Sequence, residues 1–351
     1  MENPIKVGLV GFGISAKVFH APFLVTNPGF DLVSVVERHR NDSKDMYPGV
    51  KIERSIEDLL KDPSIELVVI TTPNQTHYPY TKLALEAGKH VVVEKPFTNT
   101  SAEAIELAEM AAKAATIVSV YQNRRYVSDF LTIKEIINNG ALGDIHEFIA
   151  HYDRYRSEAR PAAWREEALQ GSGILYDLGP HLIDQSIQLF GLPDAITADI
   201  RLQRPHARVD DFFEIWLHYH KLKVTLHAGM LVREMGPRYL VHGTKGSFIK
   251  HGEDPQEALL RAGELPAGEH WGAESENSYG LVHTEINGLV QKHTYPSHRG
   301  DYQLYYDNIF KSIREGEPVK ETAMDGYHII RLIELAIRSN EKGCKINCDF
   351  S

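Results

Sequence analysis

The chain has 351 residues, of which 42% are hydrophobic and 25% are charged. This length predicts about two domains, and the composition is that of a globular protein with a sizeable buried core. The net charge of −10 argues against nucleic acid or an anionic membrane as a partner, because either would favour a basic surface. The apolar stretch at 5–14 is too short for a membrane span and lacks signal-peptide features, so we expect a buried first strand in a cytoplasmic protein.

Cysteine and histidine give little sign of a metal site. The only cysteines, Cys344 and Cys348, lack C-x-x-C spacing and are interpreted as reduced thiols, which suits the cytoplasm. Of the 18 histidines, His218 and His220 share one face of a predicted strand. No acidic or histidine partner follows them at ligand spacing, so no metal is expected.

The first third of the chain alternates strands with helices. Strands are predicted at 5–10, 31–36, 65–71, 90–94 and 116–121, and helices from the glycine turn to about 26, at 76–87 and at 101–115. Thr100 and Glu103 form a capping box ahead of the last of these helices. Strands that are apolar on both faces and separated by helices indicate a parallel sheet. We therefore predict a doubly wound α/β domain, a Rossmann domain, at residues 1–122.

The pattern changes after about residue 140. Long alternating segments lie at 145–155, 196–203, 212–220, 223–232 and 239–250, and Asn287-Gly288 predicts a hairpin between 284–286 and 289–292. This spacing predicts a large, mostly antiparallel open sheet with one face covered and the other available to a partner. Helices at 302–314 and 325–341 are expected to pack on one face of it. Residues 123–351 are therefore predicted to form a second α/β domain.

A glycine turn follows the first strand. Gly11 permits the tight turn, Gly13 allows the backbone to approach a pyrophosphate, and Ala16 keeps the third position small. The phosphates would lie at the helix N-terminus, next to Ile14 and Ser15. The motif follows a strand, opens a helix and precedes a second strand that ends in an acid, which is the context a dinucleotide site requires. We predict that the chain binds NAD or NADP.

The acid at the end of the second strand leaves the choice of cofactor open. Glu37 is placed to accept a hydrogen bond from the adenosine ribose and to disfavour a 2′-phosphate. Its neighbours Arg38, His39 and Arg40 favour the opposite choice, since guanidinium groups bind phosphate well. An ordinary surface charge cluster is the alternative interpretation.

Several motifs occur in the order that one known family shows. They are G-F-G-I-S-A (11–16), T-T-P-N-Q-T-H (71–77), E-K-P (94–96) and L-Y-D-L-G-P-H (175–181), with Y-Q-N-R-R (121–125) and R-Y-L-V-H-G (238–243). Along its whole length the chain resembles the Gfo/Idh/MocA oxidoreductases, and the last two segments look most like the scyllo-inositol dehydrogenase branch. The resemblance implies a Rossmann domain followed by an α/β domain whose open sheet builds a homo-oligomer, a dimer or tetramer.

The resemblance also implies roles for individual residues. Lys95 would be the lysine of the catalytic site, and Asp177 and His181 an acid–base pair that also contacts substrate. The cofactor would be lined by Thr72, Pro73, Asn74, His77, Glu94 and Asn123, and by Trp164 and Arg165 from the second domain. Glu37 departs from the small residue that we expect in the NADP-using relatives, which keeps the phosphate preference open.

The residue types suit alcohol oxidation, which needs a base for the hydroxyl proton and stabilisation of the charge on oxygen. His181 lies four residues after Asp177, so one helix would present both on nearly the same side. The ammonium group of Lys95, at the carboxyl end of a strand, could polarise the reacting oxygen. Taken singly, Asp177 could be a helix N-cap, His181 a core histidine and Lys95 a surface lysine.

The edge of the substrate site is less well defined by the sequence. Arg124 and Arg125 could hold a polar substrate or brace the junction between domains with acids. Further candidates for the substrate rim are Tyr155, Arg156, His283 and Tyr302. The tyrosines of 302–306 are interpreted mainly as helix packing.

The function that these observations favour is hydride transfer between nicotinamide and a hydroxyl group of a polyol or sugar, such as an inositol or aldose. A small molecule is therefore the expected partner, with no nucleic acid and no membrane. The alternatives are a non-catalytic dinucleotide-binding regulator, which would not need Lys95, Asp177 and His181, or a glycosidase that uses bound NAD. Biliverdin reductase-like chemistry is a more distant possibility.

Overall fold

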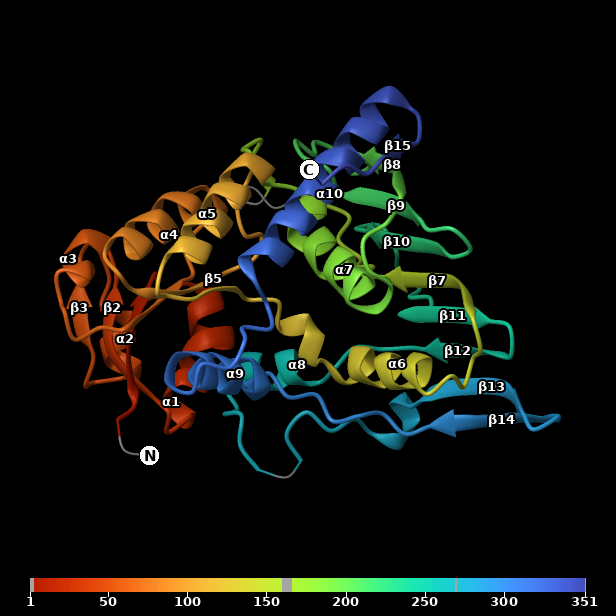
Figure 1. Ribbon diagram of the computed structural model, residues 1–351, viewed down its shortest axis with the longest axis horizontal. Helices are drawn as coiled ribbons and strands as arrows, with labels where there is room; N and C mark the ends of the chain where they lie inside the picture. Colours follow the sequence, from red (N-terminus) through yellow and green to blue (C-terminus); the bar gives the residue numbers. More distant parts are fainter. Residues whose placement is uncertain (1–2, 160–165, 269, 351) are drawn as a thin grey trace. The chain divides into compact units, whose positions relative to one another are not determined.

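The computed structural model describes residues 3–159, 166–268 and 270–350, which form two compact units (Figure 1). The first unit contains the described residues up to 123 and those within 256–271 and 301–327. The second unit contains 124–255, the described residues of 272–300, and those from 328 onward. Residues 123–351 were predicted to form one domain, whereas two later segments of the chain pack with the first unit.

The first unit is built on a parallel sheet, which we call the first sheet. Its order in the described residues is β3-β2-β1-β4-β5-β6, from β1 (Ile5–Val10), β2 (Phe30–Val36), β3 (Lys51–Glu53), β4 (Leu67–Ile70), β5 (His90–Val93) and β6 (Val118–Val120). β1, β4 and β5 are almost wholly buried, as a sheet with helices on both faces requires. The order is that of a doubly wound dinucleotide-binding domain and confirms the predicted Rossmann fold.

Helices connect these strands. They are a π-helical turn (Ala16–His20) continued by α1 (Ala21–Thr26), then α2 (Asp42–Met46), α3 (Ile56–Leu60), α4 (His77–Glu86) and α5 (Ser101–Lys113). The predicted capping box of α5 is present, with Thr100 and Glu103 bonded reciprocally. The helices α2 and α3 were not predicted, because five residues are too few to show a 3.6-residue period.

Two segments from late in the chain complete the first unit. They contain α8 (Gln256–Arg261) and α9 (Gln303–Arg314). The ring of Tyr306 lies against Phe23 and Phe30, and Tyr302 also contacts Phe23. The expectation that the helix at 302–314 packs on the antiparallel sheet is therefore wrong. Its aromatic face is buried against α1 and β2 instead, where it removes large apolar rings from water.

The second unit is built on a larger sheet, which we call the second sheet. Its order in the described residues is β14-β13-β12-β11-β7-β10-β9-β8-β15, from β7 (Ile145–His151), β8 (Ala195–Arg201), β9 (Phe212–His218), β10 (Lys223–Gly229), β11 (Tyr239–Gly243), β12 (Gly246–Lys250), β13 (Gly280–Ile286), β14 (Leu289–Tyr295) and β15 (Ile346–Asn347). It is antiparallel except where β7 runs parallel to β10. This confirms the predicted mostly antiparallel sheet.

Turn chemistry explains where the strand prediction held and where it did not. Asn287 and Gly288 both have positive φ and join β13 to β14, as the hairpin signal predicted. The segment 239–250, expected as one strand, reverses at Thr244 and Lys245 to form β11 and β12. A Cβ added at Gly243 would lie 2.2 Å from the carbonyl oxygen of Leu142, so this reversal requires glycine.

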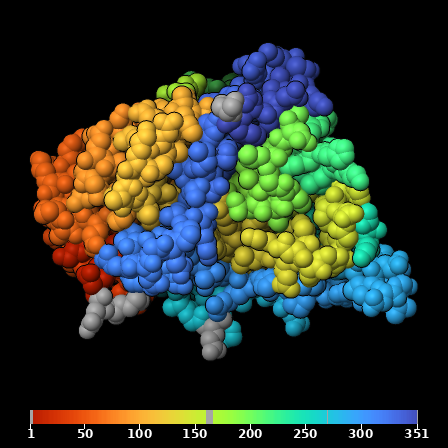
Figure 2. Space-filling model, viewed as in Figure 1, coloured from red at the N-terminus to blue at the C-terminus, as the bar shows by residue number. Residues whose placement is uncertain are grey.

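Helices lie on one side of the second sheet. α7 (Ile174–Phe190) packs on β9 and β10, and α6 (Ser128–Asn138) lies on the same side, as Figures 1 and 2 both show. α10 (Ala323–Lys342) continues from the first unit into the second. We call the face opposite α7 the open face. Strand register places the following residues on it: Ile149, His151, Glu214, Trp216, Thr225, His227, Leu240, Ile249 and Leu281.

Within the described ranges, no helix combines the length and the apolar character needed to cross a lipid bilayer.

Candidate functional site

The glycine turn has the backbone geometry that a pyrophosphate requires. Gly11 has φ +91°, where a Cβ would lie 3.0 Å from the side chain of Thr72. A Cβ built at Gly13 meets no described atom within 4 Å, so that side of the turn is open to a ligand. Ala16 is fully buried, whereas Ile14 is exposed. The turn therefore leaves its backbone accessible at the start of the helix.

A cavity of about 290 Å³ lies beside this turn at the carboxyl ends of β1 and β2. Its lining residues are Val10, Gly11, Phe12, Val36, Glu37, Arg38, His39, Arg40, Thr72 and Tyr80. In open α/β sheets this crevice is where ligands bind, and in a Rossmann domain it receives the adenosine ribose. The predicted charge cluster at the end of β2 thus lines the cavity.

The carboxylate of Glu37, which lines this cavity, is already engaged in hydrogen bonds. Glu37 is 6% exposed and accepts hydrogen bonds from the backbone N–H groups of Asp42 and Ser43 and from the Ser43 hydroxyl. The carboxylate therefore accepts from backbone N–H groups in the first turn of α2 that have no partner within the helix, and these groups favour a negative charge. Arg54 secures the same loop by donating to the carbonyl oxygens of Glu37 and Arg40.

The loop after β4 is held by His77. Its Nδ1 lies 2.7 Å from the carbonyl oxygen of Pro96, and its Nε2 lies 2.9 Å from that of Thr72. Burial lowers the pKa of His77, although both carbonyl groups favour the protonated ring. This side chain joins the loops that follow β4 and β5. Pro73 and Asn74 begin the 3₁₀ turn of the first loop, and Asn74 is buried.

A buried polar chain connects the glycine turn to the loop after β5. Glu94 Oε1 accepts from the Ser15 hydroxyl and lies 3.0 Å from His20 Nε2. His20 Nδ1 is 2.7 Å from the hydroxyl of Tyr306. Glu94 Oε2 accepts from the backbone N–H of Lys95 at 3.0 Å. Burial alone would raise the pKa of Glu94, but the contact with His20, the charge of Lys95 and the Ser15 hydroxyl lower it to about 2.

Lys95 follows directly from this carboxylate. It stands at the carboxyl end of β5 and is half-buried. Because Glu94 binds both Ser15 and the Lys95 backbone, the position of the lysine is coupled to the glycine turn. Asn123 begins the 3₁₀ turn Asn123–Tyr126 and is buried in the first unit.

Asp177 and His181 lie on α7 in the second unit. The helix begins at Ile174 with Gly173 at its N-cap, so Asp177 is inside the first turn and the N-cap alternative is wrong. The capping carboxylate is Asp210, which accepts from the backbone N–H of Leu175 at 2.6 Å.

Both residues contact the segment that continues β7. An oxygen of Asp177 lies 3.7 Å from the Arg154 guanidinium, and the ring of Tyr152 lies 6.2 Å from that of buried His181. Tyr152 and Arg154, two residues apart in this segment, therefore approach residues of α7 that are one turn apart. The spacing of four residues on the helix matches the spacing of two along the strand.

The two neighbouring arginines have separate roles. Arg125 forms a buried two-pronged ion pair with Asp184 of α7, with one N–O distance of 2.9 Å. Both residues of this pair lie within the second unit, so it differs from the expected brace across the junction between domains. The guanidinium of Arg124 lies over the ring of Tyr152 at 5.9 Å.

The remaining candidates for the substrate rim differ in how much of each side chain is exposed to solvent. Tyr155 is 40% exposed, with the Arg233 guanidinium over its ring. His283 is exposed on β13. Tyr302 is fully buried in the first unit, which excludes it from any rim. Trp164 and Arg165 lie outside the described residues.

Sequence reasoning missed several residues that support these groups. His20 and Tyr306 continue the polar chain from Glu94, Asp210 caps α7, and Arg154 pairs with Asp177. None belongs to a recognised motif. Tyr306 is separated from His20 by 286 positions, so no local signal links them.

Comparisons with known proteins agree with this geometry. Residues 5–122 match the model of the Gfo/Idh/MocA oxidoreductase family's NAD-binding Rossmann fold, and 134–348 match its C-terminal α/β domain. The chain belongs to the Gfo/Idh/MocA oxidoreductase family. A relative in Bacillus subtilis, scyllo-inositol 2-dehydrogenase (NADP(+)) IolW, is 43% identical over 97% of this chain and 95% of its own length.

Two further relatives match over almost the whole length. The uncharacterised oxidoreductase YdgJ of Escherichia coli is 42% identical over 97% of each chain. The solved structure of an oxidoreductase from Bacillus subtilis, yvaA, superposes with a TM-score of 0.96 at 41% identity and covers 99% of both chains. The chain is therefore an oxidoreductase with an NAD(P)-binding fold.

Proposed function

We propose that the protein is a dehydrogenase that moves a hydride between NAD(P) and a hydroxyl-bearing carbon of a polyol or sugar. The observation that carries the proposal is the connection from Ser15 through Glu94 to the backbone of Lys95. It couples a lysine at the carboxyl end of β5 to the turn that receives the cofactor phosphates. Family membership over both units supports the same chemistry.

The first unit fits a nicotinamide dinucleotide. The positive φ of Gly11, the open side of Gly13 and the cavity beside β2 provide a path for the pyrophosphate and the adenosine ribose. When bound, the nicotinamide ring supplies the hydride acceptor or donor. The protein's own side chains then have to hold the substrate and move the hydroxyl proton.

Three side chains are proposed for these tasks. His181 takes the hydroxyl proton during oxidation and returns it during reduction, since imidazole titrates near neutral pH. Lys95 stabilises the negative charge that develops on the reacting oxygen. Asp177, held at 3.7 Å by Arg154, orients His181 or accepts a hydrogen bond from a second substrate hydroxyl. Arg124 and Tyr155 are proposed to contact the rest of the substrate.

We further propose that the cofactor is NADP. The carboxylate of Glu37 is occupied by three hydrogen bonds from the start of α2, which reduces its repulsion of a 2′-phosphate. Arg38 and Arg40 line the same cavity and supply positive charge. The NADP dependence named for the IolW relative supports this choice.

The proposed substrate is a ring polyol, in line with the inositol named for that relative, and the proposed location is the cytoplasm. We also propose that the open face builds a homo-oligomer. It carries partly exposed apolar side chains on adjacent strands, including Leu240, Ile249 and Leu281, and Trp216 is 37% exposed. Contiguous apolar surface of this kind is typical of a protein interface.

Turnover measured on the pure protein tests the proposal. We expect reduction of NADP⁺ with at least one member of a panel of inositols and aldoses, followed by absorbance of the reduced cofactor. His181→Ala should abolish most turnover while cofactor affinity is nearly unchanged. Tight cofactor binding without turnover of any polyol would instead favour a non-catalytic regulator, and release of a glycoside's leaving group would favour an NAD-assisted glycosidase.

A further inference from the structure

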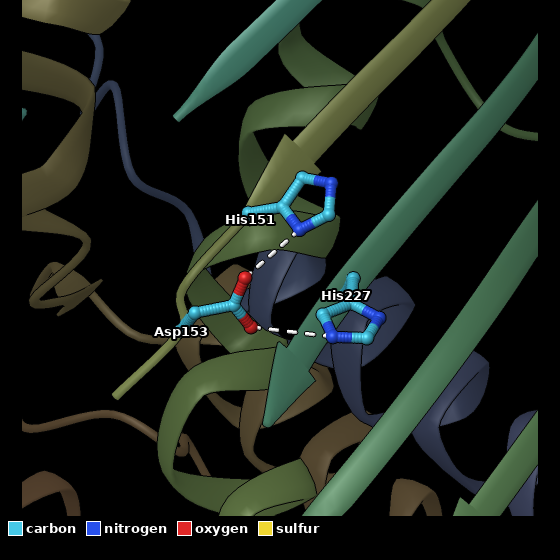
Figure 3. A group of neighbouring side chains, drawn as sticks. All are labelled: His151, Asp153 and His227. Atoms are coloured by element: carbon cyan, nitrogen blue, oxygen red, sulfur yellow. Dashed lines mark hydrogen bonds and ion pairs between the residues drawn. The ribbon is translucent and has the colours of Figure 1, made fainter. Parts of the chain in front are cut away.

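A cluster of metal-ligating side chains lies in the second unit. His151 and Asp153 come from the end of β7 and just beyond it, and His227 comes from β10 (Figure 3). The Asp153 carboxylate stands between the two imidazole rings, as Figure 3 shows. Its Oδ2 is 3.0 Å from His151 Nδ1, and its Oδ1 is 3.2 Å from His227 Nε2. One ligand atom of each residue lies within 4.8 Å of the other two.

The strands hold this cluster in place. β7 and β10 are parallel, and their register sets His151 directly beside His227, with ring centroids 4.9 Å apart. Asp153 lies two residues after His151 and so projects to the same face. The backbone N–H of Gly229 donates to Asp153 Oδ1 at 3.0 Å and fixes the carboxylate. The cluster is therefore organised by the sheet rather than by a mobile loop.

A second carboxylate supports one of the histidines. Glu214 on β9 stands opposite His227 in the register, and its Oε2 is 3.6 Å from His227 Nδ1. This leaves Nε2 of His227 directed at Asp153. A histidine that ligates metal commonly pairs its other ring nitrogen with a carboxylate, which sets the tautomer and raises the basicity of the ligand.

The donor set indicates the kind of ion. Two imidazole nitrogens and one carboxylate oxygen suit Zn²⁺ and related divalent transition metals, whereas Ca²⁺ and Mg²⁺ favour oxygen ligands. Tetrahedral Zn²⁺ with bonds of about 2.0–2.2 Å separates neighbouring ligand atoms by about 3.3–3.6 Å. The separations of 3.0 and 3.2 Å run to different oxygens of Asp153, and one ligand atom of each residue lies within 4.8 Å of the other two. Binding an ion would therefore rotate the carboxylate, so that one oxygen serves both rings, and would draw the three ligand atoms closer together.

We propose that His151, Asp153 and His227 form a three-ligand site for one divalent transition-metal ion on the open face, with water as the fourth ligand. The ion is structural, because Tyr152 and Arg154 alternate with the ligands and face α7, where they approach His181 and Asp177. The ion would link β7 to β10 on the open face, on the opposite side from Tyr152 and Arg154. The proposal does not depend on the proposed dehydrogenase activity.

Binding of Zn²⁺ alone to the chelator-treated full-length protein tests the site. Isothermal titration should show one ion per chain, and the ion should raise the melting temperature. His227→Gln should weaken binding by more than 100-fold, and Glu214→Gln by about 10–100-fold, the usual loss for a residue that supports a ligand. His283→Gln removes another histidine of the same sheet and should leave binding unchanged.

A second set of measurements excludes simple misfolding. Each variant should melt near the wild-type temperature without metal, and Co²⁺ should give the visible absorption of a low-coordinate site in the wild type but not in Asp153→Asn. Failure of the wild type to bind Zn²⁺, or equal binding by His227→Gln, would overturn the proposal and leave a metal-free His–Asp–His cluster. NADP⁺ binding followed by fluorescence should be the same with and without Zn²⁺, so the two proposals fail separately.

Discussion

The two units hold the carboxylates of the candidate site in different ways. Glu94 in the first unit is 9% exposed and bonded to Ser15, His20 and the backbone of Lys95. The Asp177 side chain in the second unit is 22% exposed and lies 3.7 Å from Arg154. A carboxylate enclosed by three partners positions its neighbours, whereas one that reaches solvent can meet a ligand. We therefore propose that Glu94 acts by holding Lys95 in position, and that Asp177 acts by contacting the substrate.

The largest expected effect is at Lys95, whose backbone N–H donates a hydrogen bond to Glu94. Lys95→Ala should reduce kcat/KM by about 10²–10³-fold, because charge on the reacting oxygen loses its stabilising ammonium. Cofactor affinity, measured by fluorescence titration, should change little. Lys113→Ala, at an exposed lysine of α5, is the control. A variant at position 95 with full turnover would remove Lys95 from the catalytic site.

The contribution of buried Glu94 to the free energy of unfolding can be tested by varying the pH. The pKa of Glu94 is lowered from 4.5 to about 2, so its ionised form stabilises the fold above pH 4.5, and this contribution disappears as the pH falls through 2. The full contribution is about 3 kcal/mol. Urea unfolding across this range should show a smaller loss of stability in Glu94→Gln than in the wild type. Matching pH slopes in wild type, Glu94→Gln and the exposed control Glu109→Gln would contradict the prediction.

The choice between NAD⁺ and NADP⁺ tests whether the buried carboxylate of Glu37 repels a 2′-phosphate. With Glu37 occupied by α2, Arg38→Ala should raise KM for NADP⁺ by about tenfold, equivalent to about 1.4 kcal/mol, and leave KM for NAD⁺ unchanged. Steady-state kinetics with both cofactors measure the ratio. Arg338→Ala, at an exposed arginine of α10, should alter neither value. An equal rise for both cofactors would mean that Arg38 does not contact the 2′-phosphate.

The smallest expected effect concerns the start of the helix that carries Asp177. Asp210→Ala removes the carboxylate that accepts from the Leu175 N–H and should lower the free energy of unfolding by about 1 kcal/mol. Denaturant unfolding measures this loss, with Asp45→Ala, at an exposed acid of α2, for comparison. No difference between the two variants would show that α7 does not need this cap.

The supporting contacts differ in how far their residues are separated along the chain. In the first unit, Gly11, Glu37, Thr72 and Lys95 each follow a strand, so parallel strand order brings them to one edge of the sheet. Sequence patterns could therefore predict this half of the candidate site. In the second unit the pairs Arg154–Asp177 and Asp210–Leu175 depend on packing between elements that no local motif links.

By itself the sequence determined the Rossmann fold, the mostly antiparallel second sheet, the family and the main candidate residues. It could do so because strand and helix periods, glycine turns and capping boxes are local, and the family motifs occur in a fixed order. Only the tertiary structure decided that α9 packs in the first unit, that Glu37 caps α2, and that His151 and His227 stand side by side. These depend on burial of distant faces and on strand pairing, whose free energy comes from contacts between residues far apart in the chain.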